Sequence, residues 1–132
     1  MKYLIDTCVI VDYLNKREPF NHAAKEIFRL VATGKIECYI SSNTVTDIYY
    51  IAKKHNHDDV RTRKGISGIL RLFNVIDLNG MDCAKALESS VYDYEDAVLV
   101  ETAIRHGIDA IITRNIKDFV NSPIKTILPS DI

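Results

Sequence analysis

Short apolar segments that alternate with longer helical segments constrain the fold of this chain more than any other feature. The predicted strands are the apolar runs at residues 3–5, 37–40, 73–76 and 109–113, with a short fifth run at 125–128. The predicted helices are the segments 9–14, 21–31, 45–54, 58–72, 81–89 and 96–106. This alternation predicts an α/β fold: a three-layer α/β/α sandwich with a mostly parallel sheet of four to five strands.

Nothing in the sequence divides the chain into separate parts. Its 132 residues are typical of one domain, and no repeat, low-complexity stretch or linker interrupts them, so we expect a single domain over residues 1–132. The three cysteines form no CxxC pair, and an odd number fits reduced thiols better than a disulfide framework. The chain has neither a run of about 18 apolar residues nor a signal peptide, so we expect a cytoplasmic protein that does not span a membrane.

The charges have to be considered locally, because a net charge of −1 does not by itself predict a nucleic acid ligand. One segment, residues 53–71, is densely basic. Its candidate phosphate-binding side chains are Lys53, Lys54, Arg61, Arg63 and Lys64. Two interpretations remain open: an ordinary solvated helix face, or a surface that follows the phosphates of a nucleic acid and binds more weakly as salt increases.

Acidic residues occur where the predicted strands end. In open parallel sheets, ligands bind beyond the carboxyl ends of the strands. Asp6 ends the first predicted strand, Asp47 follows the second, and Asn115 and Asp118 follow the fourth. Asp96 opens the long helix before the fourth strand. The fold therefore predicts several carboxylates along one rim of the sheet.

Each of these acids also has a structural interpretation, which is helix capping. Asp6 stands where an N-cap residue is expected. The pairs with the spacing of a capping box are Thr44 with Asp47, Asp93 with Asp96, and Asn115 with Asp118.

As a set, the acids favour a metal site. Carboxylates that lie close together repel one another and take up protons unless a cation joins them. Carboxylate oxygens suit Mg²⁺ or Mn²⁺, and the four scattered histidines offer no softer cluster. One or two such ions could activate water and stabilise the oxygens of a phosphoryl displacement.

Four segments of the sequence resemble the PIN-domain family, which includes the nuclease toxins of VapBC toxin–antitoxin pairs. They are Tyr3–Ile10, Ser41–Ile48, Asp93–Ala97 and Ile112–Phe119. Each segment is short, but they occur in the family's order and at its separations. Together with the order of strands and helices, the resemblance covers nearly the whole chain.

The resemblance implies a role for each candidate site residue. Asp6 and Asp96 would be the central metal ligands, and Asp47 would take a position that the family usually gives to Glu. Many relatives have Asp where this chain has Asn115, so the fourth ligand would be either Asp118 or Asn115. The remaining implied roles are water-mediated coordination by Asp93 and Glu95, and hydrogen bonds to the carboxylates from Thr7 and Thr113.

The implied activity is hydrolysis of RNA phosphodiester bonds by a metal-dependent endoribonuclease, the toxin of a toxin–antitoxin pair. Family likeness also implies a homodimer and a small antitoxin protein that covers the site. Arg114 follows the fourth predicted strand and either reaches the scissile phosphate or pairs with a neighbouring acid. Both interpretations of Arg114 remain open from the sequence.

Two other classes of function compete with this one. The first is a catalytically degenerate PIN-like module that binds RNA or serves as a scaffold, which the Asn115 and Asp47 departures favour. The second is a phosphate-handling enzyme of another α/β family, but a haloacid-dehalogenase-like phosphatase would need an Asp where Cys8 stands. No glycine-rich phosphate loop is present, so ATP, NAD and flavin are not expected.

Overall fold

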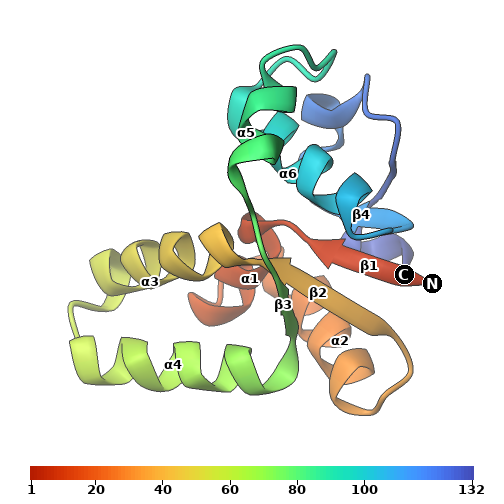
Figure 1. Cartoon of the computed structure of the whole chain (residues 1–132). Coiled ribbons are helices and arrows are strands. Elements are labelled where there is room, and N and C mark those ends of the chain that lie inside the picture. The colour runs from red at the N-terminus through yellow and green to blue at the C-terminus, as the bar shows by residue number, and fades with distance from the viewer.

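Five parallel strands form one sheet in the computed structural model, which describes all 132 residues (Figure 1). The strands are β1 (Lys2–Ile5), β2 (Glu37–Ser41), β3 (Asn74–Ile76), β4 (Ala110–Ile112) and β5 (Lys125–Ile127), in the order β3-β2-β1-β4-β5. Every neighbouring pair is parallel. The predicted α/β class is therefore confirmed, with the short fifth run as the edge strand β5.

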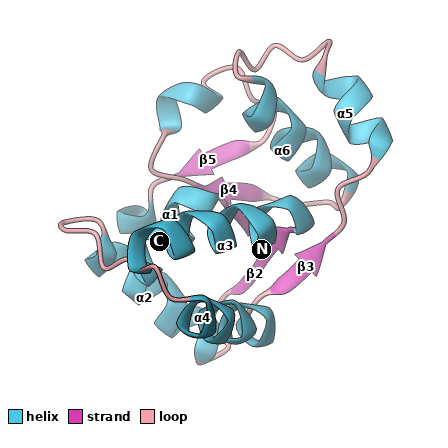
Figure 2. Cartoon of the chain, turned by 90° about the vertical axis from the view of Figure 1, so that its left-hand side faces the viewer, coloured by secondary structure: helices cyan, strands magenta, loops and turns pink.

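Six α-helices cover the two faces of this sheet (Figure 2). They are α1 (Thr7–Leu14), α2 (Asn21–Ala32), α3 (Ser42–Asn56), α4 (Asp59–Leu72), α5 (Gly80–Ala86) and α6 (Tyr94–Arg105). Two short 3-10 helices, η1 (Ile116–Phe119) and η2 (Pro129–Asp131), precede and follow β5. None of the helices is long and apolar enough to cross a membrane.

The two central strands are buried on both faces, which explains why they are continuous apolar runs rather than alternating ones. Ile5 and Ile112 pack into a core with α1, α2, α3 and α4. Leu4 and Ile111 point the other way and pack with α5 and α6. Successive residues of a strand thus pack into the cores on opposite faces of the sheet. The result is the predicted three-layer sandwich.

Register places the ends of β1 and β4 side by side. Leu4 pairs with Ile111, and Ile5 pairs with Ile112. The ladder continues one step further, because the Asp6 amide donates to the Ile112 carbonyl at 3.0 Å. The next residues along both strands, Asp6 and Thr113, therefore emerge together at the carboxyl rim.

Four helices begin earlier than the apolar pattern predicted: α1 at Thr7 instead of residue 9, α5 at Gly80 instead of residue 81, and α3 and α6 as follows. Helix α3 starts at Ser42 instead of Val45, because the strand ends at Ser41 and the polar residues after it form the first helical turn. Helix α6 starts at Tyr94 instead of Asp96, because the Asp93 carboxylate accepts a hydrogen bond from the Asp96 amide. Polar residues at a helix start satisfy amides that have no partner in the helix, so apolar periodicity misses this turn.

Candidate active site

Asp6 leaves the central strand at the carboxyl rim and occupies the N-cap position of α1. Its side chain makes no capping hydrogen bond. Instead, one carboxylate oxygen accepts a hydrogen bond from the Thr113 hydroxyl at 2.8 Å and another from the Cys8 thiol at 3.6 Å. The capping interpretation does not account for this carboxylate, which is held in place by the neighbouring strand.

Burial raises the pKa of Asp6 above its ordinary value, and the hydrogen bond from Thr113 opposes this shift. The negative charge of Asp118 raises the pKa of Asp6 further. A partly desolvated carboxylate that feels a second acid is poorly stabilised by the protein alone.

Asp96 stands in the first turn of α6, near Asp6. The capping interpretation applies to Asp93, whose carboxylate accepts the Asp96 amide at 3.0 Å, whereas the Asp96 carboxylate caps nothing. Burial, followed by the negative charges of Asp6, Asp93, Asp118 and Glu95, raises the pKa of Asp96 to about 7. Acids from β1, α6 and η1 thus share one electrostatic environment.

Asp47 and Glu95 form the other side of this acidic group. Thr44 lies inside α3, so it cannot be the capping partner of Asp47. Burial raises the pKa of Glu95, followed by the charge of Asp47 and of Asp93. A hydrogen bond with Asp47 and the charge of Asp6 act in the same direction. Glu95 therefore lies between Asp47 and the Asp6–Asp96 pair and interacts with acids on both sides.

The loop after β4 presents both candidates for the fourth ligand. Asn115 is exposed, and its side chain makes no capping hydrogen bond. Its backbone amide donates to the Thr113 hydroxyl at 3.0 Å. Asp118 is also exposed, but its charge acts on both Asp6 and Asp96. Of the two residues, Asp118 adds negative charge to the acidic group.

Thr7 hydrogen-bonds to another hydroxyl in this structure. Its side-chain oxygen lies 3.2 Å from that of Thr44, which in turn lies 3.1 Å from the Ser41 hydroxyl. The early start of α3 brings Thr44 to this position. The Thr7 side chain therefore connects α1 to α3, the helix that carries Asp47. The Thr7 backbone makes the expected hydrogen bond to a carboxylate, and this bond lowers the pKa of Asp6.

Arg114 forms a bidentate ion pair with Asp12, which is buried in α1. The two nitrogen–oxygen distances are 2.7 and 3.1 Å. The guanidinium also stacks on Phe20, 4.1 Å from the ring centre. The structure thus shows the second of the two interpretations left open for Arg114. Sequence reasoning missed Asp12, although an acid within the apolar helix pattern of residues 9–14 was a signal that a cation would face it.

The basic segment divides into paired and unpaired side chains. Asp59 lies 2.8 Å from Arg63 and 3.6 Å from Lys53, and it also accepts the Tyr49 hydroxyl. Lys54, Arg61 and Lys64 form no ion pair. All of them lie on the α3–α4 hairpin, which projects from the sheet in Figure 1.

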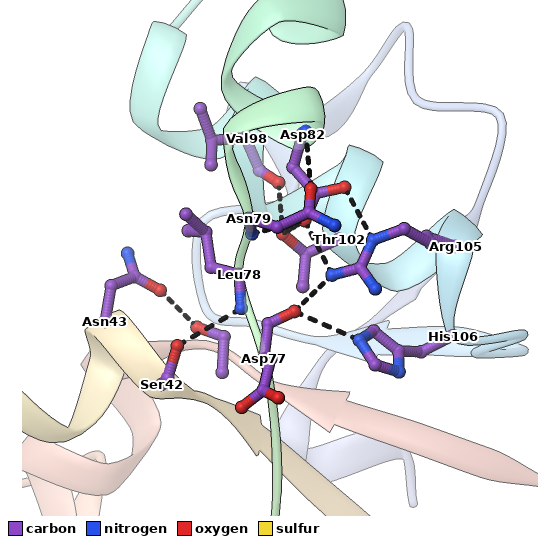
Figure 3. Close-up of polar contacts among 11 residues, drawn as sticks. Ser42, Asn43, Asp77, Leu78, Asn79, Asp82, Val98, Thr102, Arg105 and His106 are labelled. Atoms are coloured by element: carbon purple, nitrogen blue, oxygen red, sulfur yellow. Dashed lines mark hydrogen bonds and ion pairs between the residues drawn. The ribbon is translucent and has the colours of Figure 1, made fainter.

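An ion pair with a buried carboxylate joins α5 to α6, the helix that carries Asp96, and the adjoining loop contacts both α6 and α3 (Figure 3). Asp82 in α5 accepts two hydrogen bonds from Arg105 in α6 at 2.9 Å and one from the Thr102 hydroxyl at 3.1 Å. The loop between β3 and α5 joins in, because the Leu78 amide donates to the Ser42 hydroxyl at 3.1 Å. The first turn of α3 and the last turn of α6 are thereby connected through one loop.

The donor set has the chemistry of a site for a hard divalent cation. No three His, Cys, Asp or Glu side chains stand at the spacing of a complete metal site in this arrangement. Carboxylates do converge, and their mutual repulsion raises the pKa of both Glu95 and Asp96. A bound Mg²⁺ or Mn²⁺ would relieve that repulsion.

Comparison with known families decides the assignment. The family model for the PIN domain matches residues 2–117. The chain belongs to the PIN-domain family. The matched part of this PIN domain contains Asp6, Asp47, Asp96 and Asn115, and it ends one residue before Asp118.

Solved structures of similar fold cover most of the PIN domain. A toxin–antitoxin complex from Klebsiella pneumoniae is 30% identical, with a TM-score of 0.69, covering 98% of this chain and 99% of that chain. VapBC2 from Rickettsia felis, bound to a DNA fragment from its promoter, is 20% identical, with a TM-score of 0.72 and coverages of 97% and 98%. VapC20 from Mycobacterium tuberculosis, a Sarcin–Ricin loop cleaving toxin, is 16% identical, with a TM-score of 0.65 and coverages of 83% and 86%. No curated protein matches the sequence.

Proposed function

We propose that this PIN-domain protein is a divalent-metal-dependent endoribonuclease and the toxin of a toxin–antitoxin pair. The convergence of Asp6 and Asp96 carries the proposal. Both carboxylates are partly desolvated, and the negative charges of neighbouring acids raise the pKa of both. Similarity to a toxin–antitoxin complex at 30% identity, and likeness in fold to a Sarcin–Ricin loop cleaving toxin, support it.

Asp6, Asp96 and Asp118 are the residues proposed to hold the ion. Asp47 is proposed as a further ligand, and Asp93, Glu95 and Asn115 as residues that contact the ion through water. When held by these residues, Mg²⁺ or Mn²⁺ would supply the chemistry of phosphodiester hydrolysis, namely activation of water and stabilisation of the charge on the phosphate oxygens.

The chain's own residues set the positions of these ligands. The Thr113 hydroxyl donates a hydrogen bond to one Asp6 oxygen and accepts one from the Asn115 backbone amide. The loop after β4 is therefore connected to the Asp6 carboxylate. The Asp12–Arg114 pair anchors the same loop to α1. The RNA phosphates would approach a rim whose ligands are fixed before substrate binds.

The first experiment incubates the protein with labelled RNA of mixed sequence, in Mg²⁺ or Mn²⁺ and in EDTA. We expect discrete cleavage products that require the metal. Asp6→Asn and Asp96→Asn should abolish cleavage, whereas Asp131→Asn, which changes an exposed acid in η2, should not. Cleavage that persists in EDTA or in both site variants would contradict the proposal.

The fourth ligand can be assigned with two variants. Asp118→Asn should weaken Mn²⁺ binding measured by calorimetry, because Asp118 supplies charge to the acidic group. Asn115→Ala should have the smaller effect. The opposite ranking would assign the fourth position to Asn115.

A second candidate function is a catalytically degenerate PIN-like module that binds RNA or acts as a scaffold. The neutral Asn115 and the lack of three side chains at metal-site spacing favour it. It predicts RNA binding without cleavage, and no Mn²⁺ binding that depends on Asp6 and Asp96. Calorimetry on the wild type and these two variants separates the two functions.

Partner proteins are part of the proposal. Tyr50 and Ile51 on α3 and Val60 on α4 are exposed apolar side chains, and they suit contact with a second copy or with a small antitoxin. Light scattering on the purified chain, alone and co-expressed with a protein encoded beside it, would show the homodimer and the complex.

A further inference from the structure

We infer that a cavity at the far end of the α3–α4 hairpin binds a backbone phosphate of the RNA, at a distance from the acidic rim. The inference rests on the proposed function, because it concerns how the same substrate strand is held. The cavity measures about 220 Å³ and is lined by Leu14, Asn15, Lys16, His55, Asn56 and Arg61.

Its charge comes from two parts of the chain that are far apart in sequence. Lys16 follows α1, and Arg61 belongs to the first turns of α4. Neither side chain forms an ion pair. No carboxylate lines the cavity, and only Leu14 among its lining residues is apolar. Two unpaired cations therefore converge on a small polar cavity.

Two acids lie between Asn56 and Arg61 in the sequence, and both make contacts away from these cations. The Asp58 carboxylate accepts the Arg61 backbone amide at 3.1 Å as the N-cap of α4. Asp59 is bound by Lys53, Arg63 and Tyr49. Neither carboxylate forms an ion pair with Lys16 or Arg61.

Asn56 adds a hydrogen-bond donor. Its side-chain carbonyl oxygen accepts the Asp58 backbone amide at 2.8 Å, while the Thr62 hydroxyl donates to the Asp58 carbonyl at 2.7 Å. The first contact orients the Asn56 side chain, and its NH₂ group makes no hydrogen bond within the chain and is available to a ligand. Two cations and this amide donor suit an anion with several oxygens.

One face of α3 connects this cavity to the acidic rim. Asp47, Ile51 and His55 are spaced at four-residue intervals, so they lie along the same side of the helix. His55 lies about 12 Å beyond Asp47 along the helix axis. A second hollow on the way, of about 500 Å³, is lined by Arg17, Ile51, Lys54 and His55 among others. The cavity and the second hollow share Asn15 and His55, and Ile51 and His55 place the second hollow on the side of α3 that also carries Asp47.

The geometry also ranks the basic residues of the hairpin. Lys53 and Arg63 neutralise Asp59, whereas Arg61 and Lys54 line the two hollows. Lys16, which lies outside the basic segment of the sequence, belongs with the second group. An RNA strand that passes along α3 would meet the cations Lys54, Lys16 and Arg61.

The test is binding of a labelled oligoribonucleotide of mixed sequence, followed by fluorescence anisotropy in EDTA at several salt concentrations. EDTA prevents cleavage and removes any metal from the acidic rim. We expect Lys16→Gln and Arg61→Gln each to weaken binding about five- to tenfold. Each should reduce the slope of log affinity against log salt by about 1.

The matched controls are Lys85→Gln in α5 and Lys125→Gln in β5, which remove the same charge from exposed positions away from the hairpin. Thermal melts of all four variants establish that they fold. If Lys16→Gln and Arg61→Gln lose no more affinity than the controls, the cavity does not bind RNA phosphate and the inference is overturned. If the same two variants instead lose binding to an acidic peptide while keeping RNA binding, the cavity serves a protein partner and the inference is also overturned.

Cleavage with Mn²⁺ separates this inference from the proposed function. A wild type that cuts RNA, with cavity variants that bind and cut like the controls, overturns the cavity alone. A wild type that neither binds nor cuts any RNA overturns both. Variants that bind weakly and also cut slowly at limiting RNA, but normally at saturating RNA, support both.

Discussion

Asp6 depends on its neighbour across the sheet. Its carboxylate is partly desolvated, and the Thr113 hydroxyl is the strongest influence that lowers its pKa. A ligand that is held in one orientation by a hydrogen bond binds a metal more tightly than one that rotates freely. The orientation of the Asp6 carboxylate, and with it the affinity for a metal, therefore depends on this single hydroxyl.

Thr113→Val should weaken Mn²⁺ binding roughly 10- to 100-fold, because it removes the hydroxyl from Asp6 while keeping the shape of the buried side chain. Calorimetry measures the affinity. Thr113→Ser restores the hydroxyl and should recover most of it. Equal affinity in Thr113→Val and the wild type would mean that the hydrogen bond does not orient the ligand.

Metal-free protein should become less stable as pH rises from about 4 to about 7. Folding raises the pKa of Asp96 from 3.8 to about 7, so the folded state holds a proton that the unfolded chain has released. This stabilisation is fully present below the unfolded pKa and is lost as pH rises through the folded value. Asp6 and Glu95 shift in the same direction.

Thermal melts in EDTA across this pH range measure the effect. Asp96→Asn cannot lose the proton, so its melting temperature should fall less steeply than that of the wild type. Parallel curves for the two proteins would show that Asp96 does not carry the dependence.

At the scale of elements, Asp12 and Arg114 join α1 to the loop after β4. The Asp12 side chain is only 2% exposed, so its charge needs a partner inside the protein. The Arg17 guanidinium is a weaker partner, because it lies 3.7 Å from the Asp12 carboxylate and is half-exposed. The ion pair lies next to Thr113, which holds Asp6, and it therefore stabilises the same loop.

Arg114→Ala should reduce the free energy of unfolding by about 3 kcal/mol, because it leaves the Asp12 carboxylate buried without its main partner. Urea denaturation measures the change. Asp12→Asn combined with Arg114→Ala should be less harmful than Arg114→Ala alone, since the buried charge is then gone. A loss of less than about 1 kcal/mol for the single variant would mean that water or Arg17 replaces the partner.

The elements themselves could be predicted from the sequence because their signals are local. The apolar runs that became β1 and β4 and the helical spacing of α2 each lie within a dozen residues. The Asp12–Arg114 pair could not be predicted, since its partners are 102 positions apart and only the fold brings them together. The early starts of α3 and α6 were missed because polar contacts decide them.

For the whole molecule, the acidic rim was predictable because a general rule of parallel sheets places it. The identity of each contact at the rim was not. Thr7 meets Thr44 because α1 and α3 pack on the same side of the sheet. Glu95 meets Asp47 because α6 and α3 come together at the rim from opposite sides. The sequence contains the residues of the site, but their pairing depends on how the layers are stacked.

Mn²⁺ should stabilise the whole fold. At a concentration about 100 times its dissociation constant, a ligand that binds only the folded state adds about 2.7 kcal/mol. Asp6→Asn and Asp96→Asn should lose this gain, which urea denaturation with and without Mn²⁺ would show. A gain that survives in both variants would place the ion elsewhere on the molecule.

The register between β1 and β4 limits how this protein can change. Asp6 and Thr113 are adjacent only because Ile5 pairs with Ile112. Inserting or deleting one residue within either strand would turn the following side chains to the opposite face. The exposed turn between α2 and β2, at residues 33–35, carries no such constraint and no residue of the site. Engineers who lengthen or permute this fold should therefore cut in that turn and leave the spacing of the two central strands unchanged.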